Sequence, residues 1–138
     1  MLFLELSTLG QEVKVGGDLR FKVSCNDKNS SLDCGFAVNL LEDKDDTENI
    51  TFQFNPRGPK SKVVMNTRHH GKWGKETVLK DKDVVNDYFQ NSFELRIHVK
   101  DFKKILVYLN GQLKTEFSCK TDITRVNYVC YSSNLSIE

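Results

Sequence analysis

Residues 93–100 read FELRIHVK, and in this stretch apolar and polar side chains alternate without exception. Successive side chains of an extended strand point to opposite faces, so the pattern predicts a strand with one buried face. A second apolar run at 105–109 is followed by Asn110-Gly111 and by a third run at 112–117. Asn-Gly favours a two-residue hairpin turn because both turn residues need positive φ. The stretch therefore predicts a strand followed by a β-hairpin.

Strand signals of this kind recur about every 8 to 15 residues, with polar or Gly-containing turns between them. The expected strands cover residues 2–6, 21–25, 36–41, 50–54, 62–66, 77–79, 93–99, 104–109, 112–117 and 125–131. No segment carries a sustained apolar stripe of helical period, and only residues 84–89 predict a single helical turn. Many short antiparallel strands predict an all-β sandwich or barrel. We expect residues 1–138 to form one domain, with polar residues 41–48 as a hairpin loop.

The charge balance points to no particular charged partner. The 138 residues include 20 basic and 19 acidic side chains, a formal charge of +1, which gives no indication of nucleic acid or an anionic membrane. No apolar run approaches the roughly 20 residues that span a bilayer, so membrane insertion is not expected. The first residues lack the basic region of a signal peptide. We therefore expect a cytoplasmic protein, an extracellular one exported by a signal-peptide-independent route, or both.

The reactive side chains show no pattern of an enzyme or a metal site. The cysteines (Cys25, Cys34, Cys119 and Cys130) lack CxxC spacing, which favours free thiols, buried or partly exposed, over a disulfide framework. His69 and His70 would point to opposite faces of an extended chain, so they make no metal pair. No nucleophile elbow or P-loop occurs, and Glu76 lacks a carboxylate partner for glycosidase chemistry. We expect no catalytic residue, no metal and no cofactor.

A polar face with an aromatic plate is predicted around residue 55. Gln53, Asn55 and Arg57 alternate with Phe52 and Phe54, so in a strand the polar three share one face and the aromatics point away. Neutral sugars offer no charge, so their sites combine bidentate polar groups with an aromatic ring. The following residues add an amide, an indole and a carboxylate, from Asn66, Trp73 and Glu76. This set predicts a carbohydrate-binding face.

Five motifs, in order along nearly the whole chain, resemble those of the galectins, a family of β-galactoside-binding lectins. Residues 36–40 resemble the family's F-x-V-N-L strand, and residues 52–57 resemble its H-F-N-P-R strand with Gln in place of His. Residues 63–67 resemble V-V-x-N-T, and residues 73–76 resemble W-G-x-E. Residues 93–111 resemble F-E-L-x-I followed by V-x-x-N-G. The resemblance implies a two-sheet antiparallel jelly-roll sandwich.

The resemblance also implies a role for each polar side chain. Trp73 should present its indole to the apolar C–H face of galactose, with a buried core tryptophan as the alternative. Asn66 and Glu76 should hold the 6-hydroxyl, with the carboxylate as a charge-assisted acceptor. Asn55 and Arg57 should read the axial 4-hydroxyl and the ring oxygen, a geometry that glucose cannot satisfy.

Two departures from the family pattern predict a shifted affinity. Gln53 can offer an amide N–H to the 4-hydroxyl, but its flexible stem is less preorganised than a His ring. Val78 stands where an Arg is usual and cannot donate to the second sugar or to Glu76. Each hydrogen bond lost costs on the order of 1 kcal/mol. Lys60 or Lys62 could meet an acidic or sulfated extension of the glycan, or simply face solvent.

The predicted function is a metal-independent lectin for β-galactoside glycans on glycoproteins or glycolipids, with altered or weakened affinity for lactose. The amide, indole and guanidinium groups of the site need no bound cation. A homodimer is one assembly that the resemblance allows. The alternative is a galectin-fold domain for protein interaction or structure that has lost sugar binding.

Overall fold

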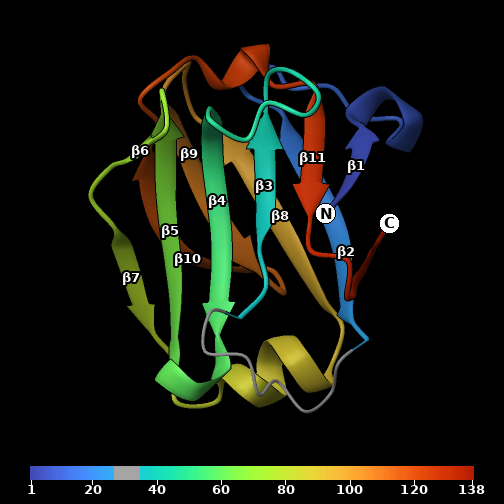
Figure 1. Ribbon diagram of the computed structural model, residues 1–138, viewed down its shortest axis with the longest axis vertical. Coiled ribbons are helices and arrows are strands. Elements are labelled where there is room, and N and C mark those ends of the chain that lie inside the picture. The colour runs from blue at the N-terminus through green and yellow to red at the C-terminus, as the bar shows by residue number, and fades with distance from the viewer. Residues whose placement is uncertain (27–34) are drawn as a thin grey trace.

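The computed structural model describes residues 1–26 and 35–138, which form short strands linked by turns (Figure 1). The strands are β1 (Leu2–Glu5), β2 (Asp18–Cys25), β3 (Val38–Leu41), β4 (Ile50–Arg57), β5 (Lys62–His69), β6 (Lys72–Trp73), β7 (Thr77–Lys80), β8 (Phe93–Val99), β9 (Lys104–Leu109), β10 (Gln112–Ser118), β11 (Tyr128–Tyr131) and β12 (Leu135–Ile137). The short helical segments are η1 (Leu6–Leu9), η2 (Gly58–Lys60), η3 (Val85–Gln90) and η4 (Ile123–Arg125). Within the described residues, no helix is long and apolar enough to cross a membrane.

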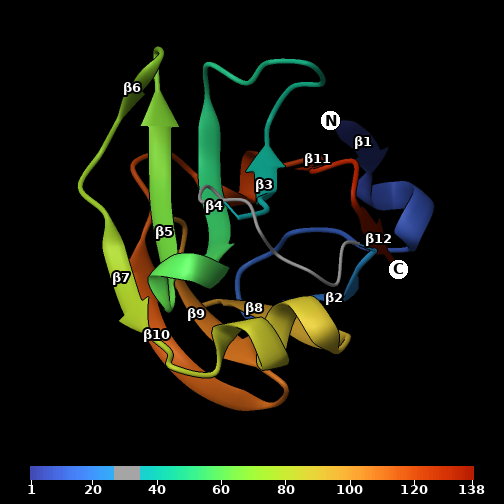
Figure 2. The same ribbon diagram turned by 60° about the horizontal axis from the view of Figure 1, so that its bottom comes forward.

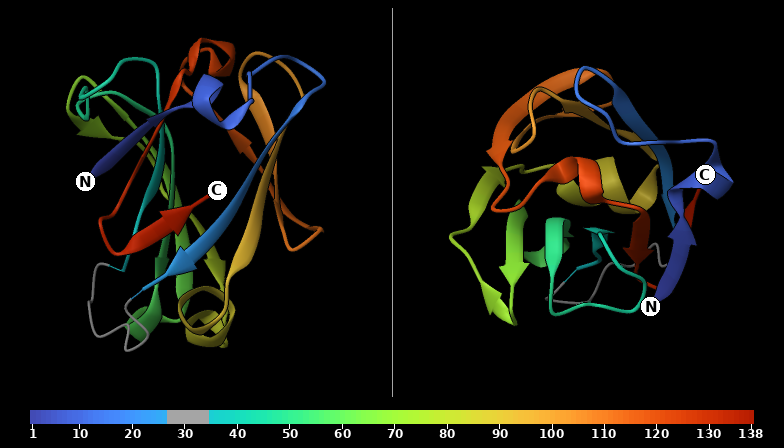
Figure 3. Two further views of the ribbon diagram at one scale, coloured as in Figure 1. Left: turned by 90° about the vertical axis from the view of Figure 1, so that its right-hand side faces the viewer. Right: turned by 90° about the horizontal axis from the view of Figure 1, so that it is seen from above.

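Two antiparallel sheets pack face to face, as the side and top views show (Figure 3). The seven-stranded sheet has the order β1-β11-β3-β4-β5-β6, and β7 also pairs with β5. The five-stranded sheet has the order β10-β9-β8-β2-β12. Neighbours in both sheets include strands far apart in the sequence, such as β11 beside β3 and β12 beside β2. The predicted two-sheet sandwich is confirmed.

The core between the sheets explains the alternation that the sequence shows. Phe52 and Phe54 of β4 are buried, whereas Gln53 between them is only half-buried. The ring centroid of Tyr88 in η3 lies 6.0 Å from that of Phe54 and 5.0 Å from that of Phe93, both nearly perpendicular. Figures 1 and 2 show η3 at the end of the sandwich that is lowermost in Figure 1 and comes forward in Figure 2. Buried aromatic contacts of this kind hold the strands that carry polar groups on their outer side.

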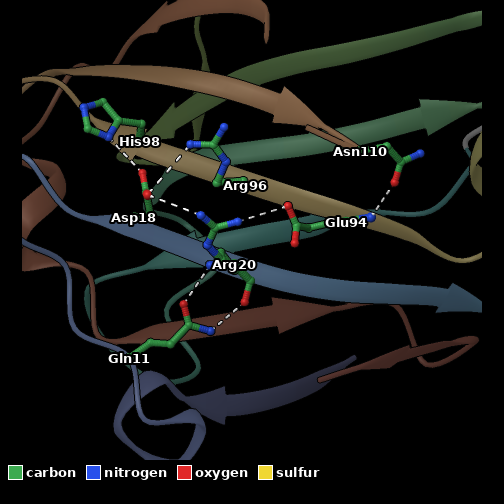
Figure 4. Close-up of polar contacts among 7 residues, drawn as sticks. All are labelled: Gln11, Asp18, Arg20, Glu94, Arg96, His98 and Asn110. Atoms are coloured by element: carbon green, nitrogen blue, oxygen red, sulfur yellow. Dashed lines mark hydrogen bonds and ion pairs between the residues drawn. The ribbon is translucent and has the colours of Figure 1, made fainter. Parts of the chain in front are cut away.

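The outer face of the five-stranded sheet carries a charge-paired network (Figure 4). Asp18 Oδ1 lies 2.8 Å from His98 Nδ1, and Asp18 Oδ2 lies 3.8 Å from Arg96. Arg20 lies 3.4 Å from Glu94 and 3.8 Å from Asp18. The polar positions of FELRIHVK therefore face solvent, and each cation in this network has a carboxylate beside it.

Several expected elements are confirmed, some with the predicted bounds and others shifted by one residue. The strands predicted at 93–99 and 104–109 are β8 and β9, and the turn between β9 and β10 has φ of 49° at Asn110 and 81° at Gly111. The helical turn predicted at 84–89 is η3. Residues 42–49 connect β3 to β4, so the predicted hairpin loop is also present.

Other boundaries were wrong for identifiable reasons. The β6 and β12 strands were not predicted, because segments of two and three residues carry too little alternation. The β4 strand runs on through Pro56, whose missing N–H is tolerated because β3 pairs with β4 only as far as Phe54. Leu6 belongs to η1 rather than to β1, and β11 begins later than expected because η4 precedes it.

The prediction of free thiols is confirmed for Cys119 and Cys130, which are free and buried. Cys25 is also buried, and its Sγ accepts a 3.7 Å hydrogen bond from Asn134 Nδ2. Cys34 lies outside the described residues. Burial raises the pKa of the Cys119 thiol to about 12, with a smaller effect from the charge of Asp101. The native thiol holds its proton more tightly than the unfolded one. It therefore stabilises the fold below the unfolded pKa near 9, and this contribution is lost as the pH rises through the folded value.

Candidate functional site

The polar side chains predicted from the sequence meet on the outer face of the seven-stranded sheet. The β4 and β5 strands pair with Gln53 opposite Asn66 and with Asn55 opposite Val64. The β6 strand and the loop after it bring the indole and the carboxylate to the side of β5 away from β4. One cavity of about 500 Å³ is lined by all six predicted residues, Gln53, Asn55, Arg57, Asn66, Trp73 and Glu76.

Asn55 and Arg57 are held in place by hydrogen bonds within this cavity. Asn55 is buried, and its Nδ2 donates to the Phe36 carbonyl oxygen at 2.7 Å. Its Oδ1 accepts a 2.9 Å hydrogen bond from Arg57 Nε. This contact fixes one edge of the guanidinium group. The remaining Nη–H donors make no hydrogen bond to a described residue and can serve a ligand.

Asn66 ties β5 to the loop that carries the indole and the carboxylate. Its Nδ2 donates to the Gly74 carbonyl oxygen at 3.0 Å, and its Oδ1 accepts from the Thr67 backbone N–H at 2.8 Å. Asn66 is 6% exposed, so the anchor is shielded from water. One N–H and one oxygen lone pair stay unused by these contacts, so the side chain can also meet a ligand.

Trp73 is 46% exposed, so the alternative of a buried core tryptophan is wrong. The Arg68 guanidinium carbon lies 5.5 Å from the indole centroid, a cation–π contact that restrains the ring. Arg68 does not line this cavity, so the indole keeps a surface towards it. Glu76 is exposed and forms no hydrogen bond or ion pair with any described residue. Its carboxylate is therefore available to a hydroxyl group.

Gln53 has a partner that sequence reasoning missed. Its Nε2 donates to Asn39 Oδ1 at 2.9 Å, and Asn39 is 1% exposed in the neighbouring strand β3. This hydrogen bond to a buried amide holds the flexible stem of Gln53 in one orientation. The Gln53 Oε1 and its second N–H remain for a ligand. Asn39 belongs to the F-x-V-N-L motif, which could have identified it.

Sequence reasoning also missed the residues on the side of the cavity nearest β3. It is lined by Gly35, Phe36, Ala37 and Ser132. Ser132 Oγ accepts a 2.9 Å hydrogen bond from the Ala37 backbone N–H. This contact depends on β11 lying beside β3, and no local pattern around residue 132 reports that pairing. Gly35 has φ of 66°, and a Cβ there would overlap the Pro56 carbonyl oxygen. Only glycine fits this close approach.

A second cavity, of about 260 Å³, lies at the other end of β5 and includes His69 and His70. The two rings are 3.9 Å apart, so the expectation that they point to opposite faces was wrong. The backbone leaves the extended conformation at His70, where φ is 51°. Partial burial lowers the pKa of His69, and His70 and Lys120 add to the effect. Among the described residues, no group of three or more side chains suits a metal ion.

Comparison with known proteins assigns the family. A family model described as galactoside-binding lectin matches residues 5–138. The chain belongs to this family. The members of this family, the galectins, are non-enzymatic lectins, so residues 5–138 form a lectin domain of the galectin family.

The lectin is similar to mouse galectin-7, with 37% identity over 70 residues, 51% of this chain and 48% of the relative. Rat galectin-7 is 37% identical over 68 residues, 49% of this chain and 47% of the relative. The matched part of the chain thus spans about half the length of these curated relatives.

Solved structures share the fold of this lectin. A double-substitution variant of human galectin-16 superimposes with a TM-score of 0.77 at 23% identity, over 99% of this chain and 90% of that one. Caenorhabditis elegans galectin LEC-6 superimposes with a TM-score of 0.74 at 20% identity, over 99% of this chain and 86% of that one. Sheep galectin-11 in complex with glycerol superimposes with a TM-score of 0.72 at 19% identity, over 99% of this chain and 95% of that one. At these identities the likeness shows the sandwich fold and no more.

Proposed function

We propose that this lectin binds β-galactoside glycans of glycoproteins or glycolipids on the outer face of its seven-stranded sheet. One observation carries the proposal. The six predicted residues, from three strands and a loop, line one cavity with an exposed indole at its border. A rigid aromatic plate beside fixed polar groups is the combination that a neutral sugar needs.

The proposed pose puts the apolar C–H face of galactose on the indole of Trp73. The 6-hydroxyl then meets the Glu76 carboxylate and the free N–H of Asn66. Asn55 and Arg57 meet the axial 4-hydroxyl from the neighbouring strand. Hydrogen-bonded Asn55 and Arg57 support this pose because they are already oriented without a ligand. An equatorial 4-hydroxyl, as in glucose, would point away from Asn55 and Arg57 and lose the hydrogen bonds to them, which costs affinity.

We further propose that plain lactose binds weakly. Val78 is 43% exposed, pairs with Val64, and lies on the same face as Glu76 two residues before it. Its side chain offers no hydrogen bond at the border of the cavity. Glu76 forms no ion pair with any described residue that would fix its carboxylate. A freely rotating carboxylate loses conformational entropy when it binds.

The substitution Val78→Arg should raise lactose affinity roughly tenfold, because a guanidinium there both orients Glu76 and donates to the second sugar. Isothermal titration calorimetry with lactose measures the change. Leu113→Arg is the matched control, since Leu113 is an exposed residue of β10 in the other sheet. It adds the same charge and should leave the affinity unchanged.

The wild-type titration should be the same with and without EDTA, because one carboxylate cannot build a calcium site. Loss of binding in EDTA, or no gain from Val78→Arg, would count against the pose.

We also propose that residues 1–138 act as one recognition domain. Its family membership is consistent with activity in the cytoplasm, outside the cell after signal-peptide-independent export, or in both places.

A further inference from the structure

Three cations form a row across the outer face of the seven-stranded sheet, beginning at Arg57 on the border of the galactoside cavity and leading away from it. Arg57 pairs with Lys62 across β4 and β5, and Lys62 pairs with Lys80 across β5 and β7. Their neighbours Val63 and Leu79 point into the core, so the three charged side chains share the outer face. Directly opposite residues have Cβ atoms about 5 Å apart, and like charges in that position destabilise a sheet. We call these three residues the cationic row.

Within residues 1–26 and 35–138, no member of the cationic row forms an ion pair. On the outer face of the five-stranded sheet, Arg20, Arg96 and the adjoining Lys100 each lie beside a carboxylate (Figure 4 shows the first two). Other lysines of that sheet, such as Lys22 and Lys104, form no ion pair with a described residue. The cationic row differs from them because its unpaired cations lie directly opposite one another on neighbouring strands.

The groove beside the row strengthens the positive charge. A cavity of about 490 Å³ is bordered by Lys60, Lys62, Lys80 and Lys82, together with Val78 and Asp81. Asp81 is the acidic exception. Its Oδ1 accepts a 2.9 Å hydrogen bond from the Asp83 backbone N–H. Burial raises the pKa of Asp87 and of Tyr88 in η3, and the nearby Asp81 adds to both effects.

The row lies in line with the galactoside cavity. Along β5, Val64 is two residues from Asn66, and Lys62 is two residues further on the same face. At about 3.3 Å per residue, each step is roughly 7 Å. Val64 and Val78 form an apolar floor between the two. Figure 1 shows the end of β4, the start of β5 and the end of β7 together at the lower ends of the strands, whereas β6 lies at the upper end. A glycan unit extending from the indole along these strands crosses the valines and meets the cations.

We propose that the cationic row binds a sulfate or carboxylate group on the sugar unit next to galactose, so that the lectin prefers anionic galactosides. This inference rests on the proposed function, because it needs galactose to be seated in the cavity. Oxygen anions accept charge-assisted hydrogen bonds from lysine and bidentate ones from arginine. A bound anion also relieves the repulsion within the row.

The test compares N-acetyllactosamine with its 6-sulfated form, in which the N-acetylglucosamine carries the sulfate, by isothermal titration calorimetry at about 0.1 M salt. The wild type should bind the sulfated ligand about five- to tenfold more tightly. Lys62→Gln/Lys80→Gln should remove this advantage and leave the neutral ligand within about twofold. The double variant should melt at the same temperature or higher, which shows that it folds. The control variant Lys22→Gln/Lys104→Gln replaces two exposed lysines of the five-stranded sheet. It should leave the affinity for both ligands unchanged.

Two further ligands show which anionic group the row binds and whether binding needs galactose. A galactosyl-glucuronate disaccharide tests the carboxylate, and a galactose-free heparin oligosaccharide tests a general polyanion. If the neutral ligand binds and neither anionic galactoside gains affinity, this inference fails while the proposed function stands. If the gain survives the double lysine substitution, the row is not responsible. If heparin binds equally well to Trp73→Ala, the row is a separate polyanion site and the inference is overturned. If no galactoside binds, the proposed function itself fails.

Discussion

Trp73→Ala is expected to weaken galactoside binding about thirtyfold, roughly 2 kcal/mol, while the protein stays folded. The indole supplies the apolar plate of the cavity, and alanine leaves the C–H face of the sugar in water. The side chain is 46% exposed and lies outside the core, so its removal should change the free energy of unfolding by less than about 1 kcal/mol. Calorimetry with a galactoside and a urea denaturation curve measure the two quantities separately.

Phe102→Ala is the matched control for the loss of the indole. Phe102 is a 60% exposed aromatic residue that does not line the galactoside cavity. Its removal should leave galactoside affinity unchanged. Sugar-dependent binding that persists in Trp73→Ala would show that the cavity does not carry the activity, and it would favour a protein-interaction role for the domain.

Gly35→Ala is expected to destabilise the fold by roughly 3 kcal/mol or more and to abolish binding. Two costs add: a left-handed backbone at a residue with a Cβ, and the displacement of a packed strand. Gly35 has φ of 66°, and the added Cβ would overlap the carbonyl oxygen of Pro56. Pro56 lies between Asn55 and Arg57, so the strand cannot move aside without moving both ligand-facing groups. Urea denaturation gives the loss of stability.

Gly16→Ala separates the two costs. Gly16 has φ of 85°, but a Cβ there would meet no atom within 4 Å. The Gly16→Ala substitution should lower the free energy of unfolding by only about 1 kcal/mol and leave galactoside binding intact. A loss of stability in Gly35→Ala no larger than in Gly16→Ala would mean that the approach to Pro56 is not tight.

The sequence predicts most of the fold because its strongest signals are local. Strict alternation identifies β8, and Asn110-Gly111 fixes the hairpin between β9 and β10, since each depends only on neighbours along the chain. The alternation of Gln53 with Phe52 likewise predicts which face of β4 is polar. Short elements such as β6 and β12 give no such signal, because they exist only through pairing with a distant strand.

The site follows the same division. Its six side chains could be named from motifs in order along the chain. Asn39, which supports Gln53, also lies in one of these motifs. Its contact with Gln53, and that of Ser132 with Ala37, could not be predicted, because both cross strand pairs set by the whole sheet. The cationic row is also a product of register: Lys80 lies beside Lys62 only because β7 pairs antiparallel with β5. Sequence separation alone gives no reason to associate them.

The central claim is that the cavity on the seven-stranded sheet reads galactose. Proton–nitrogen NMR spectra of the labelled protein, recorded with methyl β-galactoside and with its glucose epimer, test it most directly. We expect the galactoside alone to shift the indole N–H of Trp73 and the side-chain amides of Asn55 and Asn66. Unshifted signals at these positions, equal shifts with both epimers, or shifts confined to the cavity around His69 would contradict the account.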